Sequence, residues 1–311
     1  MTNQIKTQIM ESAISYMAGK EMTAANLSKL SGVNQSYLSA MLNGKLTVMV
    51  GEKETDIQDK WWLLLADAVG VSLEKKYWKA VPTKQMRHIM TSLETARDNG
   101  RATTIICDTG LGKSFCVDRF QNEYPKDVFV ITINSMVKLH DVVNMLLDKL
   151  NLPQKSSKAM RMITIVMKLR EMKRAGLKPT IIFDEAENME HALVKMMKGL
   201  FDGLTGYATL IQIGTPQLLA KMERAKNSNM EGGPQYYRRF KAGIQKVSPV
   251  VNFEPFFKEL GIEPQLQKLL IKQCDNYGEL HDYLEPALRE TDVRGVPLTA
   301  EEFRVIYNLA A

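Results

Sequence analysis

The sequence predicts an α/β fold built on a parallel sheet, with a helical domain before it and a smaller helical domain after it. Three observations support this prediction. A glycine-rich turn at residues 107–114 lies between a strand-like apolar run and a helix-like segment. An apolar run at residues 179–185 ends in two acids, which is typical of a buried parallel strand that carries a site. Helical patterns fill both ends of the chain, so we expect domains at 1–80, 81–252 and 253–311.

The composition is that of a water-soluble protein with an excess of positive charge. The 311 residues include 41 Lys and Arg against 35 Asp and Glu, which gives a net charge of +6 and a pI near 9.0. Three cysteines (Cys107, Cys116 and Cys274) are too few for a disulfide framework and lack the spacing of metal ligands. We expect a cytoplasmic protein without membrane contact, because no apolar run reaches the roughly 18 residues of a membrane helix.

Residues 23–44 have the pattern of a helix-turn-helix. Leu27 and Leu30 would give the first helix an inward face, and Gly32 would supply the turn. The second helix has four apolar residues on the face that we expect to be buried: Tyr37, Leu38, Met41 and Leu42. This layout resembles the helix-turn-helix of phage-repressor-like domains.

The second of these helices is the expected recognition helix for DNA. Its polar residues and a flanking lysine are the candidates for DNA contact: Asn34, Gln35, Ser36, Ser39 and Lys45. Asn and Gln can pair with adenine edges in the major groove. A small helical bundle that contacts proteins is the alternative. Residues 1–80 hold nine lysines, no arginine and eight acids, whereas strong phosphate binding normally needs a denser basic face.

Residues 107–114, Cys-Asp-Thr-Gly-Leu-Gly-Lys-Ser, have the pattern of a phosphate-binding loop. We expect Lys113 to lie along the β- and γ-phosphates of ATP or another nucleoside triphosphate, and the Ser114 hydroxyl to ligate Mg²⁺. Cys107 stands where the pattern has its first glycine, so the φ angle of Cys107 must be negative or the loop must adjust. The expected nucleotide-binding residues are Asp108, Thr109, Gly110, Leu111, Gly112, Lys113, Ser114 and Phe115.

The acidic strand supplies the second half of the expected site. In α/β sheets ligands lie at the carboxyl ends of the strands, so residues 107–114 and 179–185 should converge on one crevice. We expect Asp184 to hold Mg²⁺ through water and Glu185 to act as the general base for the attacking water.

The other elements follow in α/β order. Strands are expected at 127–133 and 207–215, and Thr215 at the end of the second could contact the γ-phosphate and the attacking water. Helices are expected at 137–150, 157–175, 264–275, 277–290 and 299–309, of which the last three would form a lid. Residues from about 77 to 85, including Pro82, have the composition of a linker.

The order of these motifs resembles that of the AAA+ ATPases of DNA transposition. The chain has a helix-turn-helix, then Gly-Leu-Gly-Lys-Ser, Ile-Ile-Phe-Asp-Glu-Ala-Glu, Ile-Gly-Thr and a helical lid. The nearest resemblance is to the target-capture ATPases of the MuB type, followed by the TnsC and IstB types, and it extends to residues 83–93. It covers most of the chain, although only the nucleotide motifs are distinctive. It implies an AAA+ P-loop NTPase core of the ASCE class, encoded by a bacterium, a phage or another mobile element.

The resemblance also implies an ATP-dependent homo-oligomer, a ring or a helical filament, in which one subunit supplies arginine to its neighbour's γ-phosphate. Arg238 and Arg239 match that position best, although surface arginines or arginines bound to DNA phosphates are the alternative. The family's lid often carries arginine in a Gly-x-x-Arg motif, whereas this chain reads Gly278-Glu-Leu-His281. Nucleotide sensing by the lid is therefore an open question for this sequence.

Basic residues are concentrated in the expected ATPase domain. Residues 155–178 hold eight Lys and Arg against one Glu, and residues 221–246 hold seven against two. Repeated around an oligomer, such segments would follow a duplex backbone with weak sequence preference, although a solvated helix face is the alternative for the first. The expected DNA contacts in that segment are Lys158, Arg161, Lys168, Arg170, Lys173 and Arg174.

These observations favour an ATPase that assembles with ATP and Mg²⁺ on double-stranded DNA and delivers that target to a transposase. Hydrolysis would then end the assembly. Two alternatives share the nucleotide motifs: a helicase-loader-like ATPase of replication, and a helix-turn-helix regulator that binds nucleotide without hydrolysing it.

Overall fold

The computed structural model describes the chain except residues 21, 52, 72–76, 155–156, 228–230 and 311, and it leaves the side chains of residues 4, 50 and 158 undescribed. The chain divides into two compact units, Met1–Lys76 and Tyr77–Ala311. None of the helices within the described ranges combines the length and apolarity needed to cross a membrane.

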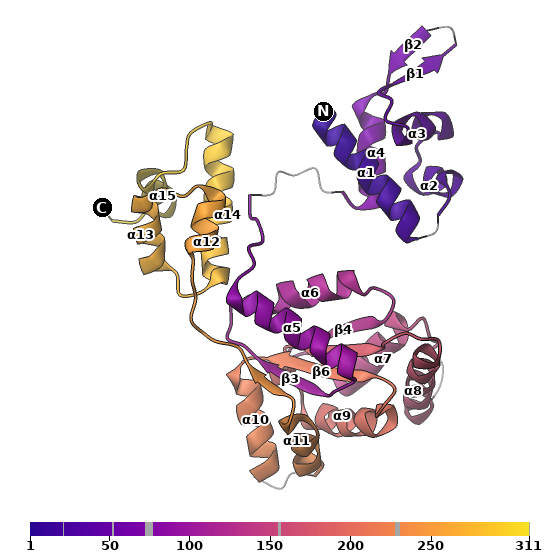
Figure 1. The fold of residues 1–311 in the computed structure, drawn as a ribbon, viewed down its shortest axis with the longest axis vertical. Helices are drawn as coiled ribbons and strands as arrows, with labels where there is room; N and C mark the ends of the chain where they lie inside the picture. The colour runs from indigo at the N-terminus through magenta and orange to yellow at the C-terminus, as the bar shows by residue number, and fades with distance from the viewer. Residues whose placement is uncertain (21, 52, 72–76, 155–156, 228–230, 311) are drawn as a thin grey trace. The chain divides into compact units, whose positions relative to one another are not determined.

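The Met1–Lys76 unit consists of helices and one β-hairpin (Figure 1). Thr2, Thr23 and Asn34 each cap a helix by accepting a backbone N–H bond on the side-chain oxygen, which explains where these helices begin. The core is apolar and includes Ile9 and Trp62. The elements are α1 (Asn3–Gly19), α2 (Ala24–Ser31), α3 (Gln35–Leu42), β1 (Thr47–Val50), β2 (Lys53–Asp56) and α4 (Asp59–Val69).

The helix-turn-helix is formed by α2 and α3. Gly32 has a φ angle of +69°, which suits glycine, and Val33 is buried beneath the turn. The hydroxyl of Ser28 donates a 2.7 Å hydrogen bond to the Val33 carbonyl. The prediction that Leu30 faces inward is wrong, because its side chain is 53% exposed. The buried face of this short helix follows Leu27 and Ser31, which are one turn apart.

The β-hairpin is an element that the sequence did not predict. Its strands pair antiparallel, from Thr47 opposite Asp56 to Val50 opposite Lys53. All four residues of β2 are exposed, so this strand lacks the alternation of apolar and polar residues that marks a half-buried strand. Strand β1 lies next to α3, so the hairpin flanks the expected recognition helix.

The Tyr77–Ala311 unit contains a five-stranded parallel sheet in the order β4-β5-β6-β3-β7. The strands expected at 127–133, 179–185 and 207–215 are all present, each somewhat shorter than expected. Their bounds are β3 (Thr103–Ile106), β4 (Val128–Thr132), β5 (Thr180–Asp184), β6 (Thr209–Gly214) and β7 (Ile244–Lys246).

Helices cover both faces of this sheet (Figure 1). Successive residues of a strand point to opposite faces, so Ile181 and Phe183 pack into one core and Ile182 into the other. The first core lies under α7 (Leu139–Lys149), α8 (Lys158–Arg174), α9 (His191–Leu204), α10 (Pro216–Asn227) and α11 (Gly233–Lys241). The second lies under α5 (Lys84–Asn99) and α6 (Lys113–Glu123) and continues into the C-terminal helices.

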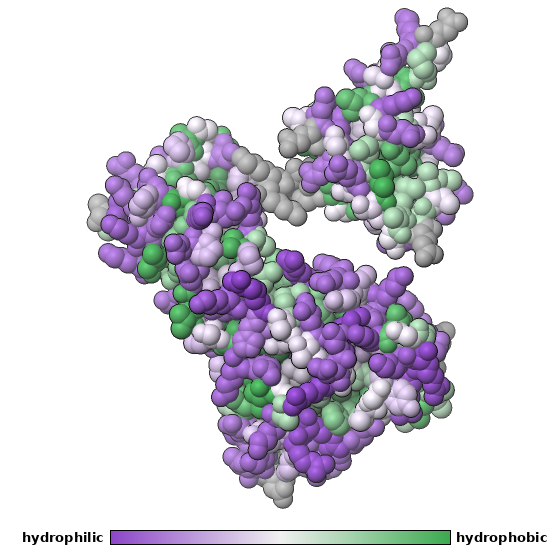
Figure 2. Space-filling view, viewed as in Figure 1, coloured by the Kyte–Doolittle hydropathy of each residue, from purple (hydrophilic) through white to green (hydrophobic). Residues whose placement is uncertain are grey.

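The C-terminal helices form the expected helical region. They are α12 (Glu254–Leu260), α13 (Pro264–Gln273), α14 (Tyr277–Arg294) and α15 (Ala300–Tyr307). Leu266, Leu280 and Phe303 are fully buried and belong to the second core, which therefore extends from the sheet into this region. The face of this unit that is visible in Figure 2 is mainly hydrophilic, as expected when the apolar residues are used in these cores.

The segment expected to be a linker is a packed part of this unit. Trp78 stacks on Phe256 of α12, with ring centroids 4.8 Å apart. Thr83 caps α5 by accepting a hydrogen bond from the Met86 N–H. The linker prediction for residues 77–85 is therefore wrong. Proline and charged residues suggested a loop, and the loop is present, but its apolar side chains pack against distant helices.

Candidate nucleotide-binding site

The phosphate loop follows β3 and ends at the first turn of α6. Gly110 and Gly112 have φ angles of +73° and +86°, so the loop uses both glycines in a conformation that other residues rarely adopt. The Lys113 ammonium donates hydrogen bonds of 3.0 and 2.9 Å to the carbonyls of Cys107 and Asp108. The loop therefore bends around its own lysine and presents the N-terminus of α6, a site suited to phosphate.

Cys107 fits the loop in place of glycine. The non-glycine residues with positive φ in the described ranges do not include Cys107, so its backbone is unstrained. The side chain is buried, and burial raises the pKa of its thiol to about 11. Cys107 is thus a protonated core residue at neutral pH. Its φ angle is not positive, so a residue with a side chain is tolerated at this position of the loop.

Asp184 and Ser114 meet at the carboxyl end of β5. The Ser114 hydroxyl donates to Oδ2 of Asp184 at 3.3 Å, and the Glu185 N–H donates to Oδ1 at 2.9 Å. Asp184 is 4% exposed, and burial raises the pKa of its carboxyl against the opposing effect of these hydrogen bonds. Two oxygen ligands at this place fit the hard-oxygen preference of Mg²⁺.

Glu185 is held in a strained backbone conformation beside Asp184. Its φ angle is +52°, which is uncommon for a residue with a side chain and often marks a functional position. The side-chain amide of Asn188 donates to Oε2 of Glu185 at 3.2 Å and to the Ile133 carbonyl at 2.8 Å. Asn188 thereby anchors the carboxylate to the end of the neighbouring strand β4.

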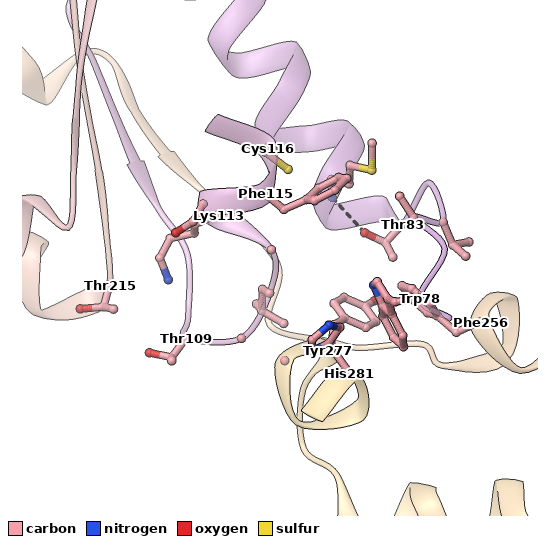
Figure 3. Close-up of a pocket in the computed structure, with 18 of the residues that line it drawn as sticks. Trp78, Thr83, Thr109, Lys113, Phe115, Cys116, Thr215, Phe256, Tyr277 and His281 are labelled. Atoms are coloured by element: carbon pink, nitrogen blue, oxygen red, sulfur yellow. Dashed lines mark hydrogen bonds between the residues drawn. The ribbon is translucent and has the colours of Figure 1, made fainter. Parts of the chain in front are cut away.

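These residues line a cavity of about 530 Å³ that has two different ends. In Figure 3 Lys113, Thr109 and Thr215 lie toward one end, and Trp78, Tyr277 and His281 lie toward the other. The first end is polar and includes Glu185 and Glu187. The second is aromatic, with the His281 ring edge-on to Trp78 at 5.1 Å between centroids. A polar end joined to an aromatic end suits the phosphates and the base of a nucleotide.

The sequence did not predict the aromatic end. Trp78 was assigned to a linker, and Phe256 and Tyr277 come from helices that are distant in the chain. Glu187 was also missed as a site residue, although it lies two positions after Glu185 in the quoted motif.

The C-terminal helical region, expected to be a lid, contacts the phosphate loop directly. The Gly278 N–H donates to the Gly110 carbonyl at 2.9 Å. A Cβ on Gly110 would lie only 1.9 Å from Oδ1 of Asn276, the residue that caps α14. His281 has Nδ1 3.0 Å from a carboxylate oxygen of Asp282. The loop and the lid therefore touch through glycine backbone and a capping side chain.

The two candidate arginines of α11 lie away from this cavity. Arg239 pairs with Asp202 and lines a second cavity with residues such as Gly100 and Gly206, which precede β3 and β6. That cavity is at the amino ends of these strands, whereas the phosphate loop follows the carboxyl end of β3. Arg238 is exposed, and no ion pair involves it within the described ranges. Neither arginine lines the phosphate-loop cavity of its own chain.

The candidate DNA contacts of the helix-turn-helix are exposed. Asn34, Gln35, Ser36 and Ser39 all lie at the surface of the Met1–Lys76 unit. The amide oxygen of Asn34 is already used, because it accepts from the N–H and the hydroxyl of Ser36. Ser36, Ser39 and Lys45 line a groove whose other wall is the hairpin and includes the acid Glu54. This acid reduces the positive character of the groove.

The basic helix α8 uses several of its cations internally. Arg161 donates to the Asn144 side chain at 3.0 Å, and Arg170 donates to the Gly203 carbonyl and lies over the Tyr207 ring. Lys168 pairs with Glu171 of the same helix. Lys173 and Arg174 are exposed at the end of the helix. The side chain of Lys158 lies outside the described part of the structure, as does residue Lys155.

Comparison with known proteins places this site in a known fold. Residues 96–222 match the family model described as "AAA domain", a range that contains the phosphate loop, Asp184, Glu185 and Thr215. No curated protein matched the sequence.

The solved structures that are similar to this chain include the following two. One is the ORC2 protein of Aeropyrum pernix in complexes with ADPNP and ADP, with 12% identity, a TM-score of 0.56, and coverage of 76% of this chain and 70% of that one. The other is Cdc6p of Pyrobaculum aerophilum, with 16% identity, a TM-score of 0.42, and coverage of 61% of this chain and 51% of that one. From the sheet, the phosphate loop and the matched domain, we conclude that this chain has the α/β AAA+ P-loop fold.

Proposed function

We propose that this protein is an ATPase that assembles on double-stranded DNA in the presence of ATP and delivers that DNA to a transposase. The observation that carries the ATPase part is the convergence of Ser114, Asp184 and Glu185 at the carboxyl ends of β3 and β5, beside the phosphate loop. This arrangement places a cation-binding pair and a possible proton acceptor around one anion site.

Each residue of the polar end has a task in this reaction. The Lys113 ammonium, which donates to the carbonyls of Cys107 and Asp108, would turn to the β- and γ-phosphate oxygens of ATP. Ser114 and Asp184 would hold Mg²⁺, which supplies positive charge to the phosphates when bound. Glu185, oriented by Asn188, accepts a proton from the attacking water. Thr215 reaches the same end of the cavity from β6.

The place of Arg238 and Arg239 supports action in an oligomer. Arg239 lies on the side of the unit where β3 and β6 begin, and neither arginine lines the phosphate-loop cavity of its own chain. Arginine stabilises the charge of a transferring phosphoryl group when supplied in cis or in trans. Only a neighbouring copy could bring these arginines to a γ-phosphate.

The DNA and transposase parts rest on charge and on motif order. The net charge of +6, together with the exposed Lys173 and Arg174, favours a polyanionic partner. The order of helix-turn-helix, phosphate loop, acidic strand and lid resembles that of the transposition ATPases. Contacts limited to phosphates would give weak sequence preference and strong salt dependence.

The first test measures ATP hydrolysis with and without duplex DNA for the wild type, Glu185→Gln and Glu190→Gln. Glu190 is the matched control, an exposed acid that pairs with Lys138. We expect DNA to stimulate the wild type, and Glu185→Gln to lose about 10²-fold in turnover because it removes the proton acceptor. The Glu190→Gln variant should behave as the wild type. Electron microscopy should show ATP-dependent assemblies of Glu185→Gln on DNA.

Other outcomes would point to the alternatives. Absence of hydrolysis and of ATP-dependent assembly would favour the regulator that only binds nucleotide. Preference for single-stranded DNA, with copurification of a replicative helicase rather than a transposase, would favour a replication ATPase. Mixing Glu185→Gln with Arg238→Ala/Arg239→Ala subunits tests the trans contact: sites that combine an intact Glu185 with a neighbour's arginines should regain activity.

A further inference from the structure

Glu187 is a second acid in the nucleotide cavity. It belongs to the short 3-10 helix η1 (Ala186–Asn188), directly after the strand that carries Asp184. Its backbone carbonyl accepts a 3.0 Å hydrogen bond from the Lys221 ammonium, which fixes the turn. Glu187 lines the same cavity as the phosphate loop and Thr215, and it also lines a second cavity against α10. Glu187 is therefore a partly buried acid at the border of the site.

The carboxylate of Glu187 lies against the backbone of Gly214. A Cβ at Gly214 would be 2.2 Å from Oε2 of Glu187 and 3.3 Å from its Cδ. A side chain at position 214 and this carboxylate cannot share the space, so glycine at the end of β6 leaves room for the acid. Since Thr215 is the next residue after Gly214, the Thr215 hydroxyl belongs to the segment against which this carboxylate lies.

Two polar atoms here are buried and have no partner in the described part of the chain. They are Oε2 of Glu187 and Oγ1 of Thr215. Buried polar atoms are almost always hydrogen-bonded, and an unpaired one is costly. A carboxylate oxygen only accepts, whereas a hydroxyl can donate or accept. Neither atom is in contact with solvent as the side chains stand. A water molecule that enters between them when these side chains turn toward the phosphate end of the cavity would satisfy both.

We propose that Glu187 and Thr215 together hold the water that attacks the γ-phosphate, which makes Glu187 a catalytic residue. This inference rests on the proposed ATP hydrolysis. In the step, the water oxygen bonds to the γ-phosphorus, the bond from that phosphorus to the β–γ bridging oxygen breaks, and ADP leaves with its electron pair. One water proton passes to Glu185 and then to solvent; the other hydrogen remains on the released phosphate and is held by Glu187 during attack.

The surroundings of the two acids explain why both are present. Oε2 of Glu185 accepts a hydrogen bond from the Asn188 amide, and this bond orients Glu185 as the proton acceptor. One carboxylate oxygen of Glu187 has no partner among the described residues, and its backbone is fixed, which suits a group that sets the direction of the water. A displacement of reacting atoms by about 1 Å can cost about 10²-fold in rate, so holding the water is a task of comparable size to accepting its proton.

The test compares Glu187→Gln, Thr215→Val and the double variant, with Glu190→Gln as control. We expect each single change to lower kcat about 10²-fold while KM for ATP changes less than about 3-fold, because the water and not the nucleotide is misplaced. If the two residues share one water, the double variant should be no more than about 3-fold slower than the slower single variant. Full activity of Glu187→Gln, or additive losses near about 10⁴-fold, would overturn the proposal.

Two further measurements separate this proposal from the proposed function and from a folding defect. Gly214→Ala keeps the carboxylate but displaces it, so it should reproduce the kinetic defect of Glu187→Gln. Binding of fluorescent ADP with and without aluminium fluoride needs no turnover. Glu187→Gln should weaken the aluminium fluoride complex about 10-fold or more and leave ADP binding unchanged. Equal binding of that complex to wild type and variant would refute a role for Glu187, whether or not the wild type hydrolyses ATP.

Discussion

Tyr236 of α11 is joined to the centre of the sheet by a buried hydrogen-bond network that allows a quantitative prediction. Its hydroxyl donates to Oε1 of Gln212 in β6, and the Gln212 amide donates to the Thr104 hydroxyl of β3 at 2.7 Å. Gln212 and Thr104 are fully buried, and Tyr236 is 2% exposed. Burial raises the pKa of Tyr236 well above its usual value, so its hydroxyl remains a neutral donor at neutral pH.

Replacing Tyr236 by Phe would leave the Gln212 oxygen without its donor. Such an unsatisfied buried acceptor costs about 1–3 kcal/mol, since water cannot reach it. We expect Tyr236→Phe to lower the free energy of unfolding by about 2 kcal/mol, which for a unit of this size corresponds to a decrease in Tm of about 4–8 °C. Calorimetry of the full chain would measure it, in the transition that added ATP stabilises, because ligand binding raises the Tm of the unit it binds.

The matched control is Tyr237→Phe. Tyr237 is partly buried, and within the described ranges its hydroxyl has no hydrogen bond, while its ring lies under the Lys226 ammonium, which phenylalanine retains. Tyr237→Phe should therefore change the free energy of unfolding by less than about 0.5 kcal/mol. On a Gln212→Leu background, Tyr236→Phe should be neutral or stabilising, because it then removes an unpaired hydroxyl. Equal losses for both tyrosines, or a Tyr236 effect that Gln212→Leu leaves unchanged, would refute the reasoning.

Two further predictions concern the phosphate loop. Gly110→Ala should displace Asn276 and separate the lid from the loop, since the new Cβ would lie 1.9 Å from the Asn276 oxygen. Nucleotide affinity, measured with a fluorescent analogue, should therefore fall by about 10-fold or more. The control is Gly261→Ala, at φ +65° with nothing within 4 Å, which carries similar backbone strain without the clash. The pKa of Cys107, raised by burial from 9.0 to about 11, should slow its alkylation at pH 8 about 100-fold relative to unfolded protein. Because the thiol ionises at lower pH in the unfolded chain, the contribution of the neutral Cys107 thiol to stability is complete below pH 9 and is lost as pH rises toward 11. Mass spectrometry would measure the alkylation of native and denatured samples, and equal rates for Cys107 in both would contradict the prediction.

The sequence predicted the parts of the site that are contiguous in the chain. The phosphate loop and the strand ending in Asp184 and Glu185 are short patterns with a local physical reason, and the parallel sheet brings them together as its topology requires. The helices and strands that connect them also lie near their expected positions, because their periodicity is strong.

The parts that could not be predicted depend on contacts between distant segments. Trp78 had no local pattern, and its partner Phe256 is far along the chain. The exposure of Leu30 depends on which side of a short helix meets its neighbours, which two leucines alone do not decide. The basic pattern of α8 was visible, but the carbonyl that accepts from Arg170 belongs to Gly203, on another helix. Charge counts cannot distinguish a cation that binds its own fold from one that is free for DNA.

Strand β6 connects helix α11, which carries the two candidate arginines, with the cavity at the phosphate loop. Its residue Gln212 holds Tyr236 and thereby α11, the helix of Arg238 and Arg239, while Thr215 follows its carboxyl end in the nucleotide cavity. The strand is fully buried and paired on both sides, so its residues cannot move independently. If the protein acts as proposed, a nucleotide that engages Thr215 in one subunit would act on the same strand that holds the helix of the arginines offered to the next subunit. This connection gives a physical reason why assembly and hydrolysis should depend on each other.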